Sequence, residues 1–318
     1  MRGPVRIVRT LLAALVLLLP AGCDGHPPQA PAATIYTGGT SGVYYQYGEA
    51  LRTSLGTAYR PLNVVPTSGS VDNVGRLAMM PSGFAIVAAD VAAAAGSGQA
   101  PFKGNVPIRA VARLYDDYIH LVVPANSPIY TGSQLRGYRV SLGGEGSGTQ
   151  LIADRVLTAD GLDVDRDVQA EELDLTGSAA ALRQHKIDAF FWSGGLPTPG
   201  ISALAAAMPI RMVDLKPEAT KLRTQYGSSY RSGTIPADTY PGGYMVTTIA
   251  IPNLLITSAS APEEDIRRFT AALFSSKGAL QRLVPTAREL DPSIAIYTEP
   301  VPLHPGAVDY YRSVKPAL

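Results

Sequence analysis

The stretch that decides the fold is TGGTSGVYY, residues 37–45. It follows a short apolar segment at 34–36 and precedes a helical pattern over 43–55. A glycine-rich turn between a strand and a helix leaves the first amide N–H groups of the helix unpaired, and these groups can bind an anion or a carboxylate. The structural alternative is an ordinary strand–helix connection capped by the hydroxyl of Thr40 or Ser41.

A second glycine turn, GGEGSGT at residues 143–149, has the same setting. An apolar segment at 138–142 comes before it, and a helix is expected from about 148 to 160. Ser147 and Gln150 have the spacing of a capping box. Because ligands of open α/β sheets bind where strands end, two such turns favour a ligand held between two lobes.

The segments around these turns alternate between strand and helix patterns. Apolar runs at 62–65 and 84–87 each lead into a polar turn and a helix, which predicts a mostly parallel sheet covered by helices. We therefore predict an α/β fold with two lobes.

The chain leaves the first lobe and later returns to it. Two strands in succession, 108–115 and 118–123, are separated by Asp116-Asp117 and break the alternation. We read these two carboxylates, and Glu171-Glu172, as solvated pairs, since neighbours on a strand point to opposite faces. The predicted lobes are 34–123 with 250–318, and 124–249.

The first residues have the pattern of an export signal. Basic residues precede an apolar run at 11–19, and the only cysteine, Cys23, follows a small-residue pair. We predict a signal peptide at 1–23 that ends at a candidate lipidation site, Cys23, and an extended Pro- and Ala-rich tether at 24–33. Pro20 departs from the lipobox pattern, so ordinary signal cleavage that releases a soluble protein is the alternative.

Composition excludes several classes of function. The 27 basic and 26 acidic residues give a net charge of +1, so no field would recruit nucleic acid. The glycine turns lack the lysine of a P-loop, and no Gly-x-Ser-x-Gly elbow occurs. The four histidines are scattered, and His120, in an apolar strand, is read as a structural residue. We expect no enzyme activity, no metal and no cofactor.

Candidate ligand-binding residues lie in the glycine turns, in the polar turn near residue 70 and at strand ends. They are Gly39, Thr40, Ser41, Tyr44, Tyr45, Ser68, Ser70, Asn73, Asp90, Gly146, Ser147, Gly148, Thr149, Trp192, Ser193 and Gly194.

Several of these residues have a structural alternative. Tyr44 and Tyr45 are adjacent on a helix, so only one can face the core. Ser68, Ser70 and Asn73 can bind the solute or cap a helix, and Ser147 and Thr149 have the same two readings. Asp90 is read first as an N-cap, with a ligand ammonium as the alternative. Trp192 ends a predicted strand, and this position favours a place in the wall of a pocket over one in the deep core.

Taken together, the segments at 37–45, 67–73, 138–143, 146–149 and 188–191 resemble the TAXI family of solute receptors of tripartite TRAP transporters. The resemblance covers about residues 34–316. It implies a type II periplasmic-binding-protein-like fold, with a ligand cleft between lobes joined by two crossing strands. It also implies glutamate, related amino acids or small dicarboxylates as ligands. Ser41 replaces a glycine and Ala89 a polar residue common in the family, which argues against glutamate itself.

These observations predict an extracytoplasmic receptor that binds a small carboxylate-bearing solute, a glutamate-like amino acid or a dicarboxylate, by lobe closure. Its partners would be TRAP membrane subunits and, through the lipid anchor, the outer face of the cytoplasmic membrane; otherwise it would be periplasmic. We expect a monomer. A ligand-sensing lipoprotein that signals to a membrane partner, and an enzyme on a binding-protein fold, are the alternatives.

Overall fold

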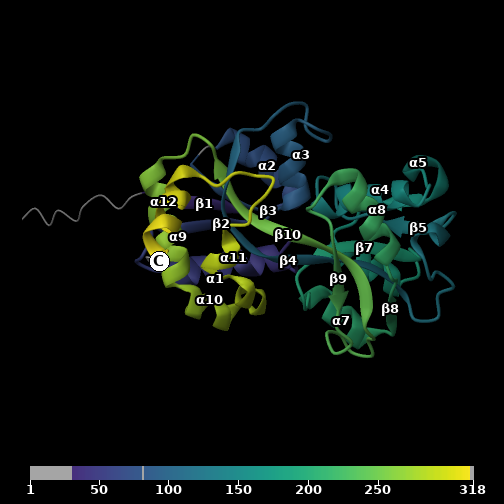
Figure 1. Cartoon of the computed structure of the whole chain (residues 1–318). Helices are drawn as coiled ribbons and strands as arrows, with labels where there is room; N and C mark the ends of the chain where they lie inside the picture. Colours follow the sequence, from purple (N-terminus) through teal and green to yellow (C-terminus); the bar gives the residue numbers. More distant parts are fainter. Residues whose placement is uncertain (1–30, 81, 316–318) are drawn as a thin grey trace, which may run out of the picture. The chain divides into compact units, whose positions relative to one another are not determined.

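The computed structural model describes residues 31–80 and 82–315 (Figure 1). The predicted signal peptide with Cys23, and residues 24–30 of the tether, lie outside these ranges. Within them, ten strands form one mixed sheet in the order β2-β1-β3-β10-β4-β7-β5-β6, with β8 paired to β4 and β9 paired to β10.

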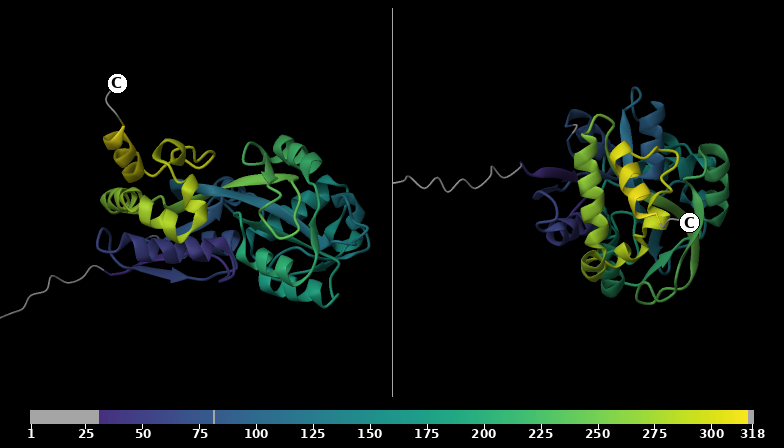
Figure 2. Two further views of the ribbon diagram at one scale, coloured as in Figure 1. Left: turned by 90° about the horizontal axis from the view of Figure 1, so that it is seen from below. Right: turned by 60° about the vertical axis from the view of Figure 1, so that its left-hand side comes forward.

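Lobe 1 is built on three parallel strands, each followed by a helix. The strands are β1 (Ala33–Tyr36), β2 (Leu62–Val65) and β3 (Phe84–Ala88), and the helices are α1 (Val43–Leu55), α2 (Ser70–Met79) and α3 (Ala89–Ser97). The C-terminal segment adds α9 (Glu263–Ser275), α10 (Lys277–Leu283), η2 (Pro285–Glu289), α11 (Pro292–Ala295) and α12 (Pro305–Val314). Figures 1 and 2 show these C-terminal helices in the same lobe as β1.

Lobe 2 repeats the strand–helix alternation. Its strands are β5 (Arg139–Ser141), β6 (Gln169–Glu171), β7 (Ala189–Gly194), β8 (Ile210–Met212) and β9 (Arg231–Ile235). Its helices are η1 (Gly132–Leu135), α4 (Gly148–Ala159), α5 (Val164–Asp167), α6 (Leu175–Arg183), α7 (Pro199–Ala207) and α8 (Lys216–Tyr226). β5 pairs in parallel with β6 and β7, as expected for strands joined by helical crossovers.

Two long antiparallel strands, β4 (Ile108–Pro124) and β10 (Val246–Ser258), run through both lobes (Figures 1 and 2). The C-terminal part of β10 pairs with β3, and its N-terminal part pairs with β9. The second half of β4 pairs with β7. These strands are the two predicted crossings, and the predicted two-lobe α/β fold is confirmed. The exact lobe bounds given above stay predictions.

The predicted strand break at Asp116-Asp117 is wrong, because β4 is continuous there. Tyr118 lies opposite Ala250 and Asp116 opposite Pro252 on β10. Asp116 is also held by ion pairs to Arg113 and Arg231, at 2.7 and 2.6 Å. These partners explain why the Asp116 carboxylate is tolerated within the strand.

Buried apolar side chains stabilise both lobes. In lobe 1, α1 places Tyr47, Leu51 and Leu55 on one face at helical spacing, all buried. Tyr47 stacks on Tyr115 of β4 with ring centroids 5.6 Å apart. Burying each such side chain contributes about 1.5–3 kcal/mol.

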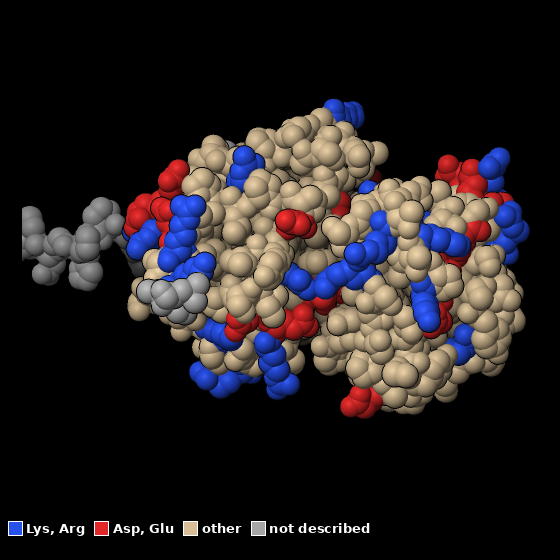
Figure 3. All heavy atoms as spheres, viewed as in Figure 1, with Lys and Arg blue, Asp and Glu red and all other residues tan. Residues whose placement is uncertain are grey.

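The surface carries both signs of charge. Figure 3 shows basic and acidic residues interspersed on the displayed face, in keeping with the balanced composition. In the described ranges, no helix combines the length and the hydrophobicity that crossing a membrane requires.

Candidate ligand-binding site

A cavity of about 220 Å³ lies where the first residues of four helices meet. Two of these helices, α1 and α2, belong to lobe 1, and the other two, α4 and α6, belong to lobe 2. The lining residues are Gly38, Gly39, Ser41, Gly42, Val43, Tyr44, Thr67, Ser68, Gly69, Ser70, Asp117, Gly144, Ser147, Gly148, Thr149, Asp174, Leu175, Trp192, Ser193 and Gly194. Eleven of the sixteen sequence candidates line the cavity, but its wall also contains several glycines and two carboxylates, Asp117 and Asp174, that were not among them.

The two helices of lobe 1 start without a side-chain cap. Their N-cap residues are Gly42 for α1 and Gly69 for α2, and neither has a side chain that could accept from the first N–H groups. The structural alternative, in which the hydroxyl of Thr40 or Ser41 caps α1, is therefore not what the structure has. Thr40 is exposed and lies outside the lining, whereas Ser41 lines the cavity, with its Oγ 3.2 Å from Oγ1 of Thr176.

The two helices of lobe 2 carry side-chain caps. Ser147 Oγ accepts from the Gln150 N–H at 3.0 Å, which confirms the predicted cap. The side chain of Gln150 returns to the N–H of Gly146 at 3.1 Å, one residue before the position expected for a capping box. Asp174 caps α6 by accepting from the Gly177 N–H at 2.7 Å.

The two lobes are in direct contact at the rim of the cavity. The N–H of Asp72, on α2, donates to the carbonyl of Gly146 at 3.1 Å. A Cβ added to Gly148 would lie 3.0 Å from Ser70 Oγ, so a larger residue there would press against lobe 1. Gly146 thus serves the contact between lobes and lies outside the cavity lining.

Tyr44 is the tyrosine that faces the cavity, and Tyr45 is half-buried outside the lining. The hydroxyl of Tyr44 donates to Oδ1 of Asn253 and lies 3.2 Å from Ser70 Oγ. Ser70 Oγ in turn accepts from the N–H of Ala88 at 3.1 Å. This chain of bonds fixes the tyrosine ring in the wall.

Asn73 is buried but does not line the cavity. Its amide group donates to the carbonyls of Thr37 and Ile86, the latter at 2.8 Å, and its Oδ1 accepts from Thr67 at 2.6 Å. These contacts hold the glycine turn against β3, a role that neither sequence reading, solute binding or helix capping, had named. Ser68, in the same turn, does line the cavity.

The end of β7 forms the opposite wall. Trp192 of lobe 2 packs on the turn of lobe 1, since a Cβ on Gly42 would lie 3.5 Å from the indole ring. The indole N–H donates to Thr198 Oγ1 at 3.3 Å. Thr149 Oγ1 accepts from the N–H of Ser193 at 3.2 Å and joins α4 to this wall.

The sequence-based prediction that Asp117 is solvated is wrong. Instead of being solvated, it is only 2% exposed and lines the cavity. Its Oδ2 accepts from Ser193 Oγ at 3.1 Å, and its Oδ1 has no partner in the described part of the chain. Burial raises the pKa of this carboxyl group to about 7, against the opposing effect of Asn253 and Ser193. The prediction that the two carboxylates point to opposite faces of the strand is correct, because the Asp116 side chain forms ion pairs with Arg113 and Arg231.

Asp90 is also buried, but away from the cavity. The expected N-cap role is wrong, because α3 begins after Ala88 and has no side-chain cap. Oδ2 of Asp90 instead accepts from Tyr230 Oη at 2.7 Å and pairs with Arg155 at 3.4 Å. Burial raises the pKa of Asp90, and the Arg155 charge opposes that shift.

The chemistry of the wall follows from its composition. Asp117 and Asp174 are its charged side chains, and none of the described lining residues is Lys, Arg or His. An anionic group of a ligand would therefore be bound by backbone N–H groups at the helix starts, where the helix dipoles also favour negative charge. Over residues 31–80 and 82–315, no cluster of His, Cys, Asp and Glu is arranged to hold a metal ion.

His120 has the structural setting expected from the sequence. It is fully buried, with Nδ1 2.9 Å from the carbonyl of Tyr118 and Nε2 2.8 Å from the hydroxyl of Tyr240. Burial lowers its pKa to about 4, so the ring is neutral at pH 7.

Two lobes, two crossing strands and a cavity at helix starts define the class of periplasmic-binding-protein folds. Solved structures agree. BugD, a periplasmic binding protein, is 12% identical, with 89% of this chain and 93% of that chain covered and a TM-score of 0.56. MatC from Rhodopseudomonas palustris, with bound malate, is 13% identical, with 80% and 88% covered and a TM-score of 0.53. SsuA from Escherichia coli, a periplasmic aliphatic sulphonate binding protein, is 17% identical, with 90% and 84% covered and a TM-score of 0.50.

The chain belongs to the NMT1-like family, whose model matches residues 35–314. This match covers both lobes and the crossing strands.

Proposed function

We propose that the protein is an extracytoplasmic solute receptor that binds a small carboxylate-bearing solute between its lobes and delivers it to a TRAP-type transporter. The observation that carries the proposal is the meeting of four helix starts at one cavity. Two of them, α1 after Gly42 and α2 after Gly69, begin without a side-chain cap, so their first N–H groups, apart from the Asp72 N–H that is bonded to Gly146, can bind an anion. The TAXI resemblance supports delivery to TRAP membrane subunits.

Lobe closure is the mechanism that these contacts support. Ser41 and Ser70 come from lobe 1, and Ser147 and Thr149 come from lobe 2, yet all of them belong to the same wall or its immediate contacts. A solute that touches both sets gains contacts available only when the lobes are together. It therefore shifts the equilibrium toward the closed state by its difference in affinity for the two states.

Export and anchoring form part of the proposal. The signal pattern and Cys23 support a lipid-anchored, monomeric receptor on the outer face of the cytoplasmic membrane, or a periplasmic one if Cys23 is not lipidated. A ligand-sensing lipoprotein would use the same cavity. Genes for TRAP membrane subunits beside this gene would favour transport, and their absence would favour sensing.

Thermal-shift screening of the exported chain against amino acids, monocarboxylates and dicarboxylates tests the proposal. A true ligand at 100 times its Kd should stabilise the fold by about 2.7 kcal/mol. Titration calorimetry of each hit, with its methyl ester as the matched control, then tests the carboxylate. We expect the ester to lose most of the affinity. Hits that bind equally well as esters, or a screen in which no carboxylate stabilises the protein, would contradict the proposal, and turnover of a hit would favour the enzyme alternative.

A further inference from the structure

We propose that Asp117 receives the protonated amine of the solute, so that the site selects zwitterionic α-amino acids with uncharged side chains over dicarboxylates. This inference rests on the proposed function, because it takes the cavity between the lobes as the solute site. It goes further by assigning a second recognition group and a ligand class.

The geometry of Asp117 carries the first step. The residue lies on β4 opposite Ile251 of β10, where the two crossing strands join the lobes. Ser193 holds one carboxylate oxygen at 3.1 Å, while the other, Oδ1, is buried and has no partner among the described residues. A buried carboxylate oxygen without a donor is costly, so a donor from the solute would relieve that cost.

The charges around Asp117 carry the second step. The titratable groups that act on it or that it acts on are Asp90, Asp116, Tyr44 and Tyr115, and none of them is a cation. Burial raises the pKa of Asp117 itself to about 7. A cationic amine at 3 Å would favour the ionised carboxylate and lower this pKa. The solute itself would therefore supply the missing positive charge.

The rest of the wall carries the third step. One carboxylate of the solute can be bound at the uncapped helix starts, but a second carboxylate would face Asp117 or Asp174 with no basic side chain in the described lining. Val43, Leu175 and Trp192 instead offer apolar surface for the remainder of the solute. A ligand with one carboxylate, one amine and an uncharged side chain matches all three features.

A different arrangement makes the opposite prediction. If Asp117 stayed protonated, it would donate to a second carboxylate, and the site would select dicarboxylates. The two cases differ in proton exchange near pH 7. Binding of an amine releases a proton from Asp117 and strengthens as pH rises from 6 to 8, whereas binding of a dicarboxylate takes up a proton and weakens over the same range.

Calorimetry on the exported chain tests this inference with matched pairs of solutes. L-alanine and L-leucine are compared with their desamino partners, propanoate and 4-methylpentanoate, and L-glutamate with glutarate. We expect at least one amino acid to bind about 10- to 100-fold more tightly than its desamino partner, the range for a hydrogen bond to a charged group. Measurements at pH 6.5 in buffers of different ionisation enthalpy should show proton release.

The variant Asp117→Asn keeps an oxygen for Ser193 and removes the charge. It should lose the same 10- to 100-fold for the amino acid while the desamino acid binds as before. Asp238→Asn, the same change at an exposed acid outside the cavity lining, is the matched control and should bind like the wild type. Equal losses in both variants, no preference for the amine, or proton uptake would overturn the inference and leave the proposed carboxylate receptor intact. Failure of every amino acid and carboxylate to bind the wild type would overturn both.

Discussion

Asp90 of lobe 1 and Arg155 of lobe 2 form a buried ion pair, with Oδ2 3.4 Å from Nη1 and side chains that are 2% and 10% exposed. Tyr230 bridges the two, because its hydroxyl lies 2.7 Å from the same Oδ2 and 2.5 Å from Nη1. The guanidinium also stacks on Tyr226, 4.4 Å from the ring centroid. If the lobes separate to admit a solute, this cluster must break and both charges return to water.

Replacing Arg155 by Met should therefore weaken solute affinity through the closure equilibrium. Methionine keeps much of the packing on Tyr226 but leaves Asp90 without a cation in the closed state, at a cost of about 1–3 kcal/mol. We expect Kd to rise by roughly 10- to 100-fold and small-angle scattering to show a more open protein. The double variant with Asp90→Asn should recover part of the loss. An unchanged Kd and scattering profile would show that the Asp90–Arg155 pair does not stabilise the closed state relative to the open one.

The Gly148→Val substitution should hold the lobes apart. A Cβ at this position would lie 3.0 Å from Oγ and 3.2 Å from Cβ of Ser70 in the opposite lobe. Because the contact is between lobes and Gly148 is the first residue of α4, folding of each lobe should be unaffected. We expect affinity to fall at least about tenfold, which is 1.4 kcal/mol, with the melting temperature of the solute-free protein nearly unchanged.

Thr158→Val, on the exposed side of the same helix, is the matched control for Gly148→Val and should bind like the wild type. Solute-induced compaction in scattering should be lost in the Gly148 variant and retained in the control. Full compaction in both variants would show that the lobes can close around a valine at position 148 without loss of affinity from this contact.

The elements that were predicted well depend on local pattern. The helix expected at 43–55 and the strand expected at 62–65 have those bounds in the structure, since apolar spacing and glycine turns are readable within one segment. The glycine turns likewise lie at the cavity. As ligand-binding residues, all sixteen candidates remain predictions.

The residues that were misplaced depend on partners far along the chain. Asp117 is buried against Ser193, 76 residues away, and Asp116 meets Arg231, 115 residues away. Asp90 has the pattern of an N-cap, but its partner Tyr230 lies 140 residues further on. The local sequence pattern does not show which residues far apart in the chain become partners in the fold. The signal that could have prevented the error is the absence of Gly, Pro, Asn and Ser between residues 108 and 123, which permits one continuous strand with one carboxylate on each face.

Acidification should destabilise the fold through His120. Its pKa is about 4 in the folded protein and about 6.5 when unfolded, so the unfolded chain binds a proton first as pH falls. Stability from the neutral ring is therefore complete above pH 6.5 and is lost as pH falls to about 4, by up to about 3 kcal/mol.

Urea unfolding of the wild type and His120→Gln at several pH values measures this contribution. The variant cannot gain the proton, so the wild type's advantage in free energy of unfolding should be largest at pH 7 and shrink toward pH 4.5. Parallel pH profiles would assign the acid sensitivity to other groups, such as Asp291, whose pKa is lowered to about 2 by hydrogen bonds from Ser293 and Lys277 and which therefore also loses stabilising contacts as pH falls.

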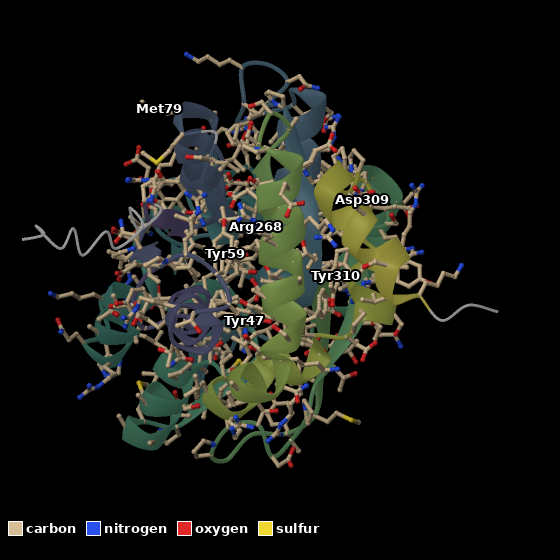
Figure 4. The ribbon with its side chains drawn as sticks, turned by 90° about the vertical axis from the view of Figure 1, so that its left-hand side faces the viewer. Tyr47, Tyr59, Met79, Arg268, Asp309 and Tyr310 are labelled. Atoms are coloured by element: carbon tan, nitrogen blue, oxygen red, sulfur yellow. The ribbon has the colours of Figure 1, made fainter. Side chains whose placement is uncertain are left out.

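Two glycine-to-alanine substitutions in helices should have opposite effects. Gly306 lies in the first turn of α12, which packs along α9, as the positions of Arg268, Asp309 and Tyr310 show (Figure 4). A Cβ there would overlap the carbonyl oxygen of Glu263 and lie 2.9 Å from its carbonyl carbon. Since backbone cannot rotate away as a side chain can, the two helices must separate. We expect Gly306→Ala to lower the free energy of unfolding by about 1–3 kcal/mol.

Gly75 provides the comparison, because it is exposed on α2 and its added Cβ would meet nothing within 4 Å. Alanine should stabilise that helix by about 0.5–1 kcal/mol, chiefly by lowering the conformational entropy of the unfolded chain. Thermal unfolding of both variants should move the melting temperature down for Gly306→Ala and up for Gly75→Ala. Shifts in the same direction would show that helix propensity, rather than the close approach of α12 to α9, governs the response at Gly306.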